Sequence, residues 1–307
     1  MTETGSTEAA AVRALWEPLG IPGIFDVHTH FLEPRIERAV WAVFDSAGDK
    51  IGREWPIHYR VSAAERVALL REFGVRHFPT LPYAHKPGIA TFLNEWAAQF
   101  KRDVPESLWS ATFYPEAEAA SYVEQALADG VEIFKVHVQV GEFWLDDPLL
   151  DPVWAQLASS RTPIVIHAGS GPVGNEHTGP DPLRRILERW PGLSVIVAHL
   201  GTPEYQPFFD LAERFENVRL DTTMVFTDFW EPFDQRLLPR VASLKDKILF
   251  GSDCPTIPYP YAHAVESITR LGLDTAWQRA VLWENGARLF GVDASVSEQR
   301  ERGRTRP

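Results

Sequence analysis

The 307-residue chain contains a single cysteine, Cys254. One cysteine excludes an intrachain disulfide and any zinc site built from several thiolates. No apolar run approaches the roughly 20 residues that a helix needs to span a bilayer. The N-terminal segment also lacks a basic leader, and Arg13 interrupts its only apolar stretch. We therefore expect no secretory signal, no membrane partner and a cytoplasmic location.

Basic residues are also scarce relative to acidic ones. The chain has 30 Lys and Arg residues against 42 Asp and Glu residues, for a formal net charge of -12. A surface of this charge repels phosphate backbones, so nucleic-acid binding is not expected. The 45% of hydrophobic residues is enough for a large core. The expected partner is a small-molecule substrate, bound by a monomer or a homo-oligomer.

Short runs of β-branched and aromatic residues alternate along the chain with segments of helical periodicity. The predicted strands cover residues 24–28, 75–81, 108–114, 131–138, 163–168, 193–199, 217–222 and 247–253. Predicted helices between them cover 62–74, 115–130, 182–190, 203–215 and 232–244. In the first of these helices Ser62 and Glu65 form a capping box, and Gly74 marks the end.

This alternation predicts the α/β fold class and a parallel (β/α)8 barrel, the TIM barrel, ringed by helices. A doubly wound open sheet is the alternative, but no GxGxxG motif follows the first strand. The barrel domain is predicted to span residues 24–291, after an N-terminal extension at 1–23. Residues 292–307 are polar and aperiodic, which predicts a disordered tail.

Residues 31–61 are too long for a plain loop between a strand and its helix. They are rich in aromatic and charged side chains, Arg60 among them. We interpret them as a cap insertion over the barrel mouth, and an ordered surface excursion is the alternative.

Histidines recur where the predicted strands end. His28 and His30 close the first strand, and because alternate residues of a strand share a face, both imidazoles can reach one metal ion. His167, His199 and Asp253 end the fifth, sixth and eighth strands. Barrel enzymes place their active groups at these strand ends, so the set predicts a metal site. Any one of these histidines taken alone would more simply be structural.

The motifs FDVHTH, VIHAG, VAHLG, FGSDCP and ENGARLFG are spread over nearly the whole chain, from about Ile24 to Gly291. Together they resemble motifs of the amidohydrolase superfamily, and most closely those of its amidohydrolase-related branch. That branch includes aminocarboxymuconate-semialdehyde decarboxylase and many metal-dependent hydrolases. The resemblance therefore implies an enzyme, and it says little about the substrate because the branch spans several chemistries.

Residue by residue, the resemblance implies that His28, His30 and His167 bind one divalent ion. It implies that Asp253 completes the ligand set and takes a proton from metal-bound water. His199 would orient water or substrate, act as acid or base, and steady the developing oxyanion. Zinc is the expected ion, and manganese, iron or cobalt would fit the same ligands.

The fourth strand leaves alternatives open. Lys135 and His137 lie two residues apart and share a face, so both could point into the barrel. In binuclear members of the superfamily a lysine of this strand is carboxylated and bridges two ions, and His199 would then bind the second ion. Otherwise the Lys135 amine would pair with a substrate carboxylate or with Asp26. Outside the strands, Arg60 and Trp144 are candidates for the lining of the substrate pocket.

Two enzymatic functions fit these observations, and hydrolysis is the leading one. A metal-dependent hydrolase would direct water at an amide, ester or lactone carbonyl of a small molecule. The alternative is a lyase, a nonoxidative decarboxylase or hydratase that acts on an aromatic or unsaturated carboxylic acid at the same metal site. A metal-free barrel that only binds a ligand is a third class, but it would be expected to lack some of the strand-end groups.

Overall fold

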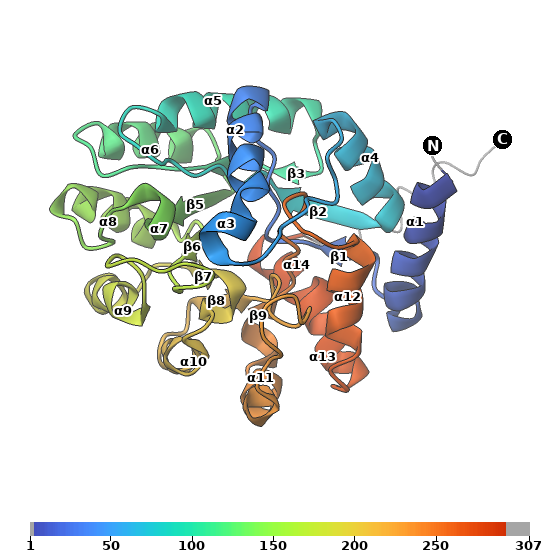
Figure 1. Cartoon of the computed structure of the whole chain (residues 1–307). Coiled ribbons are helices and arrows are strands. Elements are labelled where there is room, and N and C mark those ends of the chain that lie inside the picture. The colour runs from blue at the N-terminus through green and yellow to red at the C-terminus, as the bar shows by residue number, and fades with distance from the viewer. Residues whose placement is uncertain (1–2, 293–307) are drawn as a thin grey trace.

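The computed structural model describes residues 3–292 and contains a closed parallel barrel (Figure 1). Its strands are β1 (Ile24–Phe25), β2 (Val75–Pro79), β3 (Ser107–Leu108), β4 (Ser110–Ala111), β5 (Ile133–His137), β6 (Ile164–His167), β7 (Val195–Val197), β8 (Val218–Asp221) and β9 (Ile248–Leu249). Each strand pairs in parallel with its neighbour in sequence, in two sheets of order β1-β2-β3 and β4-β5-β6-β7-β8-β9.

Two junctions join these sheets into one barrel. β3 and β4 are the two parts of the third predicted strand, which is interrupted at Trp109. At the other junction the Val27 amide donates to the Phe250 carbonyl at 2.9 Å, and the Asp253 amide donates to the His28 carbonyl at 2.8 Å. The (β/α)8 barrel prediction is therefore confirmed, and the open sheet is not formed.

Helices surround the strands in Figure 1. They are α1 (Glu3–Trp16), α2 (Pro34–Asp45), α3 (Ala47–Ile51), α4 (Ala63–Phe73), α5 (Ala90–Asp103), α6 (Ala119–Ala128), α7 (Val138–Gly141), α8 (Asp151–Ser160), α9 (Pro180–Arg189), α10 (Tyr205–Arg214), α11 (Leu238–Ser243), α12 (Tyr261–Thr269), α13 (Thr275–Arg279) and α14 (Asn285–Leu289). Short 3-10 turns lie at Glu17–Leu19, Pro148–Leu150, Ala198–Gly201, Gln235–Leu237 and Lys245–Lys247, and a π turn lies at Ala280–Glu284.

Local sequence signals explain some of these boundaries better than others. The capping box before α4 is formed, because the Ser62 amide donates to Glu65 Oε2 at 2.9 Å and the Glu65 amide to Ser62 Oγ at 3.3 Å. Gly74 ends that helix with a φ of 84°. The helix predicted from residue 115 begins only at Ala119, and the one predicted from 232 is reduced to a 3-10 turn and α11.

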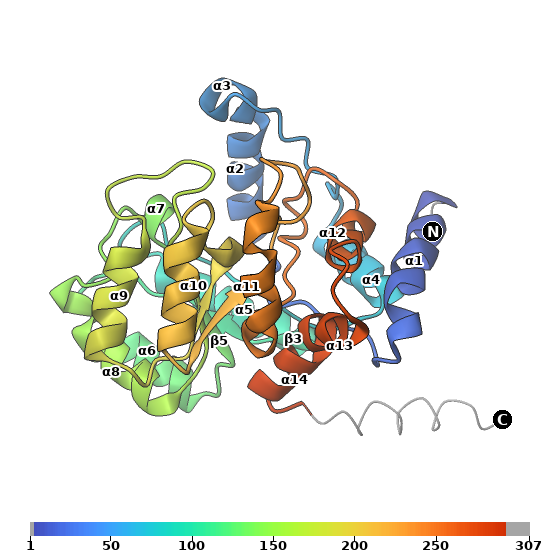
Figure 2. The same ribbon diagram turned by 90° about the horizontal axis from the view of Figure 1, so that it is seen from below.

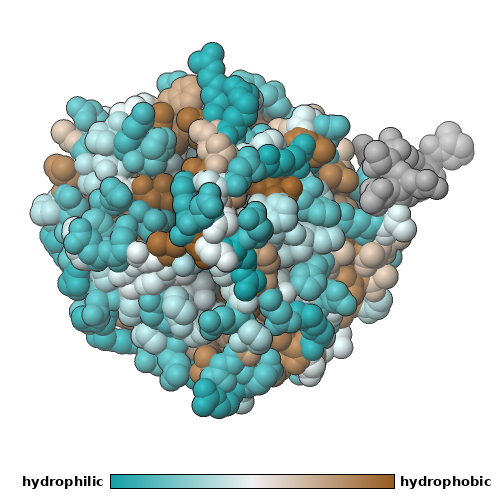
Figure 3. Space-filling view, viewed as in Figure 1, coloured by the Kyte–Doolittle hydropathy of each residue, from teal (hydrophilic) through white to brown (hydrophobic). Residues whose placement is uncertain are grey.

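The strands are buried on both faces, as the helices outside and the packed interior require. Every residue of β6 and β7 is buried, including the apolar runs Ile164–Ile166 and Val195–Val197. The surface on the side shown in Figure 3 is mostly hydrophilic, with hydrophobic residues between hydrophilic ones near the middle. No helix within residues 3–292 is long and apolar enough to cross a membrane.

The N-terminal extension packs against the outside of the barrel. Helix α1 contacts α4 and α12, and the Trp16 indole donates to the Phe73 carbonyl at 2.9 Å. A side chain at Gly74 would collide with the Trp16 ring, since a Cβ there would come within 2.3 Å of it. The extension therefore completes the outer layer beside α4. The predicted tail, apart from Val292, lies outside the described residues.

The insertion at 31–61 forms α2 and α3, which project from one end of the barrel in Figure 2. Its returning segment is fixed to the barrel loops, because Trp55 donates to the Thr256 carbonyl and the His58 amide to the Ile257 carbonyl. The Trp55 ring also packs on Phe229 and Trp230, in the segment after β8. This segment anchors the insertion at the end of the barrel where the strand-end histidines lie.

The docking of α1 predicts a stability change. The Trp16→Ala variant should lower the free energy of unfolding by about 3–5 kcal/mol, because it empties a site where Trp16 is only 5% exposed. Urea unfolding followed by far-UV circular dichroism measures the change. Val43→Ala is the control: Val43 is 55% exposed on α2, so its replacement should cost less than about 0.5 kcal/mol. Equal effects in the two variants would contradict this docking.

Candidate metal centre

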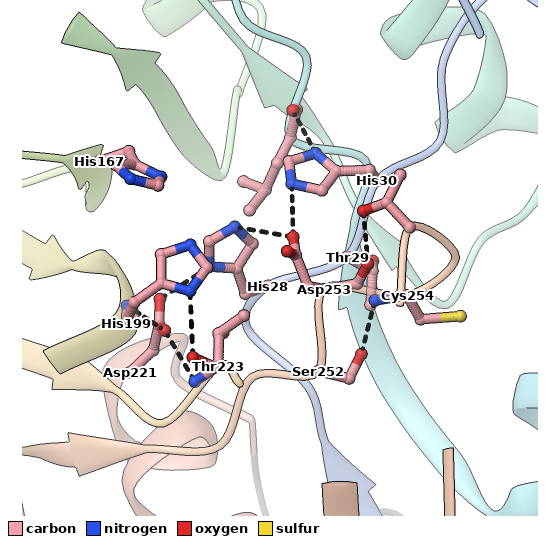
Figure 4. Close-up of polar contacts among 12 residues, drawn as sticks. His28, Thr29, His30, His167, His199, Asp221, Thr223, Ser252, Asp253 and Cys254 are labelled. Atoms are coloured by element: carbon pink, nitrogen blue, oxygen red, sulfur yellow. Dashed lines mark hydrogen bonds and ion pairs between the residues drawn. The ribbon is translucent and has the colours of Figure 1, made fainter. Parts of the chain in front are cut away.

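The strand-end side chains meet at one end of the barrel (Figure 4). His28 and His30 follow β1, and Asp253 follows β9. Within residues 3–292, these three form the group whose possible ligand atoms all lie within 4.8 Å of one another. Asp253 Oδ1 is 3.0 Å from His30 Nε2 and 3.6 Å from His28 Nε2. Ligands about 2.0–2.1 Å from a single ion are about 3.0–3.5 Å apart, so these spacings fit a metal site.

Hydrogen bonds on the outer side of each ring determine where the lone pairs lie. His30 Nδ1 is 3.1 Å from the Leu81 carbonyl oxygen, which can only accept, so Nδ1 carries the hydrogen. In neutral His30 the lone pair is therefore on Nε2 and faces the Asp253 carboxylate. Two electron pairs in contact repel each other unless a proton or another cation lies between them. The donor set therefore fits a divalent ion.

His28 is oriented by a buried carboxylate. Its Nδ1 is 2.9 Å from Asp221 Oδ2, and both side chains are almost fully buried. Burial, followed by the charge of Lys135, lowers the pKa of His28 to about 3. The imidazole is therefore neutral, with its hydrogen on Nδ1 and a lone pair on Nε2.

The two carboxylates of the site are held in their ionised form. Burial raises the pKa of Asp221, but the neighbouring His28 outweighs burial and holds that pKa well below its usual range. For Asp253 the opposing effects are burial, which raises the pKa, and the contacts with His30 and His28, which hold it well below its usual range. Both carboxylates are therefore negative at neutral pH.

Several residues that carry or bind these side chains have left-handed backbone conformations. His199 has a φ of 56°, Asp253 a φ of 70° and Leu81, whose carbonyl binds His30, a φ of 38°. Residues other than glycine rarely adopt such angles, which cost on the order of 1–3 kcal/mol each. The surrounding hydrogen bonds hold the chain there, so the loops that follow β2, β7 and β9 carry strain at the site.

His199 and His167 stand beside the three-residue group. The His199 ring centroid lies 5.1 Å from that of His28 and 4.7 Å from that of His167. His199 Nδ1 is 3.0 Å from the Thr223 carbonyl, so it carries the hydrogen and Nε2 has the lone pair. Burial lowers the pKa of His199 and keeps it neutral. The oxyanion role expected for His199 requires a donor, and this hydrogen bond leaves none on Nε2.

The His167 ring faces a different set of partners. Its Nε2 donates to the Gly171 carbonyl at 2.9 Å, and its ring stacks on His137 with centroids 3.9 Å apart. His167 is therefore near the group of His28, His30 and Asp253 and not part of it. Its free electron pair is on Nδ1.

Lys135 is completely buried in β5 and contacts His28, with its Nζ 3.3 Å from His28 Nε2. Burial lowers the pKa of Lys135 to about 8, although the charges of Asp221 and Asp253 act in the opposite direction. Asp26, the partner considered for this amine, instead accepts hydrogen bonds from the Tyr261 hydroxyl and from backbone amides. Lys135 therefore places an amine directly beside the expected ligands. This amine is a cation in its protonated form and a base in its neutral form.

The two remaining candidates interact with other residues. Arg60 pairs with Asp45 within the insertion, and its side chain is 40% exposed. Trp144 is also 40% exposed and packs edge-on against His177. Neither contacts a histidine of the strand ends.

Sequence reasoning missed two residues of the site. Asp221 ends β8, at the same position in its strand as the predicted histidines, and this placement was the available signal. Besides binding His28, its Oδ1 accepts from the His199 amide at 2.9 Å and from the Thr223 amide at 3.1 Å. Tyr83 follows β2, and its ring lies 5.7 Å from His30 and 5.4 Å from His137.

Comparison with known proteins identifies the family of this chain. A family model described as amidohydrolase matches residues 25–292, most of the chain. A comparison with proteins of curated function finds none that matches.

Several solved structures share the fold at low sequence identity. An uncharacterised TIM-barrel protein from Bordetella bronchiseptica has a TM-score of 0.73 and 20% identity, over 89% of this chain and 99% of that one. A 5-carboxyvanillate decarboxylase from Novosphingobium aromaticivorans, complexed with manganese and 4-hydroxy-3-methoxy-5-nitrobenzoic acid, has a TM-score of 0.63 and 15% identity, over 89% and 97%. A 4-oxalomesaconate hydratase from Rhodopseudomonas palustris has a TM-score of 0.56 and 16% identity, over 92% and 100%. At this identity the likeness shows the fold alone.

Asp221 provides a test of the centre that does not need a substrate. In the Asp221→Asn variant the amide can keep accepting the two backbone hydrogen bonds, but its NH2 group then faces His28 Nδ1. His28 should move its hydrogen to Nε2 and lose the inward lone pair, so affinity for Zn²⁺ should fall about 10–100-fold. Competition with a chromogenic chelator measures this affinity.

Asp181→Asn is the matched control, because Asp181 is exposed on α9 and pairs with Arg184 on the same helix. It should bind Zn²⁺ as the unmodified protein does. An Asp221→Asn variant that binds Zn²⁺ with undiminished affinity would rule out the proposed orientation of His28.

Proposed function

This chain belongs to the amidohydrolase family and is an enzyme of the amidohydrolase superfamily, and we propose that it is a metal-dependent hydrolase. Its substrate would be a small molecule with an amide, ester or lactone carbonyl, attacked by water. The observation that carries this proposal is the position of the Asp253 carboxylate, 3.0 Å from His30 Nε2 and 3.6 Å from His28 Nε2, where its low pKa makes it a base. Such a carboxylate can accept a proton but has none to donate.

His28, His30 and Asp253 would hold the metal ion, with His167 as a further candidate ligand. Zinc suits imidazole and carboxylate ligands, and manganese, iron and cobalt fit the same set. When bound, a divalent ion lowers the pKa of water and polarises a carbonyl oxygen.

The chain's own residues supply the proton transfers. Asp253 accepts a proton from the attacking water and returns it to the leaving nitrogen or oxygen as the carbon–heteroatom bond breaks. The lone pair of His199 Nε2 accepts a hydrogen bond from the same water and orients it. Lys135, with a pKa lowered to about 8, contributes positive charge near the carbonyl in its protonated form.

A lyase is the second candidate, and two observations favour it. The decarboxylase and the hydratase with similar folds act on carboxylic acids, as their names state. Beside the barrel end, Trp55 packs with Phe229 and Trp230 at ring separations of 5.1–5.3 Å, which would suit a planar aromatic acid. A decarboxylase must protonate the carbon that loses carbon dioxide, and a carboxylate held beside two histidines is better placed to accept a proton than to donate one. We therefore prefer hydrolysis.

The Asp253→Asn variant tests the hydrolase proposal. Wild-type protein loaded with Zn²⁺ or Mn²⁺ should hydrolyse members of a panel of aryl esters and lactones. Loss of the carboxylate should lower kcat about 10²–10⁴-fold, because the base is gone, while much of the metal stays bound. Metal content by plasma mass spectrometry separates the two effects, and Asp246→Asn, an exposed aspartate remote from the site, is the control.

An Asp253→Asn variant with full activity would contradict this mechanism. Carbon dioxide release from hydroxybenzoates by a protein inactive on the whole ester and lactone panel would favour the lyase instead. Metal content of the wild type is informative in itself: about one equivalent agrees with a single ion, whereas two would support a carboxylated Lys135.

A further inference from the structure

Six aromatic rings form a closed circuit around the site. Neighbouring centroids along it lie 3.9–5.7 Å apart. The rings, in order, belong to His28, His30, Tyr83, His137, His167 and His199. They come from the ends of β1, β2, β5, β6 and β7, so the circuit follows the rim of the barrel.

One part of this circuit offers electron pairs. His28, His30 and His199 each give the Nδ1 hydrogen to an outward acceptor, and their lone pairs remain on Nε2. Together with Asp253 they make the side that suits a cation. In the neutral form, a ring with its hydrogen on Nδ1 cannot donate a hydrogen bond from Nε2 to a substrate oxygen.

The opposite part offers hydrogen-bond donors. His137 Nδ1 accepts from the Val140 amide at 3.4 Å, so the hydrogen of neutral His137 is on Nε2. His137 differs in this from His28, His30 and His199, because its backbone partner is an N–H group and theirs are acceptors. The Nε2–H group is present whether or not the ring is protonated, because the hydrogen bond from Val140 occupies the other ring nitrogen.

Tyr83 is the member of the circuit that carries a phenol side chain. Burial, and then the charge of Asp253, raise its pKa well above the ordinary value, so the hydroxyl keeps its hydrogen. Within residues 3–292 the structure gives this hydroxyl no hydrogen-bond partner. The Tyr83 ring contacts the rings of His30 and His137. The side chain is half-buried, so the hydroxyl is not sealed from solvent. A phenol hydrogen in this position is available to a bound molecule.

We propose that Tyr83 Oη–H and His137 Nε2–H form a donor pair for the substrate oxygen that becomes negative during the reaction. For a hydrolase this oxygen is the former carbonyl oxygen of the tetrahedral intermediate, so the inference rests on the proposed function. Donors placed where charge develops stabilise the transition state more than the ground state.

Phenylphosphonate is a suitable probe, because its tetrahedral anionic group imitates such an intermediate. Its dissociation constant is measured by isothermal titration calorimetry on the metal-loaded protein. The Tyr83→Phe variant should bind it about 10–100-fold more weakly, because one hydrogen bond to a charged oxygen is lost. The variant should retain its metal content, since Tyr83 contributes no ligand, and in hydrolysis kcat should fall more than KM rises.

Matched variants separate the hydrogen bond from packing. Tyr122→Phe removes a phenol on α6 whose hydroxyl forms hydrogen bonds with Tyr114 and Glu116, and it should leave phenylphosphonate affinity unchanged. His137→Phe keeps a ring to stack on His167 but has no donor, so it should weaken binding. His137→Gln keeps an N–H group and should recover part of the affinity.

The outcomes distinguish this inference from the proposed hydrolysis. Equal affinity in wild type and Tyr83→Phe, or no binding of phenylphosphonate by the wild type, would overturn the donor pair whatever reaction the enzyme performs. If Tyr83→Phe weakens binding but the wild type only releases carbon dioxide from hydroxybenzoates, hydrolysis fails and the donor pair stands. If Asp253→Asn abolishes hydrolysis while Tyr83→Phe changes neither affinity nor kcat, the hydrolase stands without this pair.

Discussion

The contact between Asp221 and His28 is the interaction on which the rest of the site depends. One carboxylate oxygen accepts the hydrogen of His28 Nδ1, and the other accepts the backbone amides of His199 and Thr223. Asp221 therefore orients an imidazole of β1 and fixes the chain after β7 and β8. Because the carboxylate is completely buried, its charge must be balanced within the site, and the protonated Lys135 amine is the buried cation whose pKa the charge of Asp221 raises.

The sequence predicted the barrel well and the finer boundaries poorly. Alternation of strands and helices is a repeated signal, so an error in one element did not alter the fold. Individual strands are shorter than predicted because residues such as His199 and Asp253 leave the β region for positive φ at the strand ends. Those angles depend on tertiary hydrogen bonds, which no local propensity encodes. The helix predicted from Pro115 begins only at Ala119, because a proline fixes φ without ensuring that a helix follows it.

The sequence predicted which residues converge at the candidate site better than it predicted the role of each residue. Convergence of His28, His30 and Asp253 follows from strand alternation and from the common end at which parallel strands finish. Arg60 and Trp144 were chosen because they lie in the insertion and in a loop expected to follow a strand, and each is 40% exposed in the structure. Tyr83 was overlooked because an aromatic residue after a strand is normally core. Which nitrogen of each ring carries the hydrogen depends on the loop that faces it, and this is set only when the barrel closes.

The backbone thus decides the chemistry of otherwise equivalent imidazoles. Where a carbonyl faces Nδ1, as at Leu81 and Thr223, Nε2 of that imidazole carries a lone pair directed at the ion site. Where an amide faces Nδ1, as at Val140, Nε2 carries the hydrogen instead. The same five histidines therefore present two kinds of surface around one circuit. A substrate bound there meets electron-pair donors on one side and hydrogen donors on the other. Such an arrangement orients a polarised carbonyl group, because its carbon and its oxygen require opposite partners.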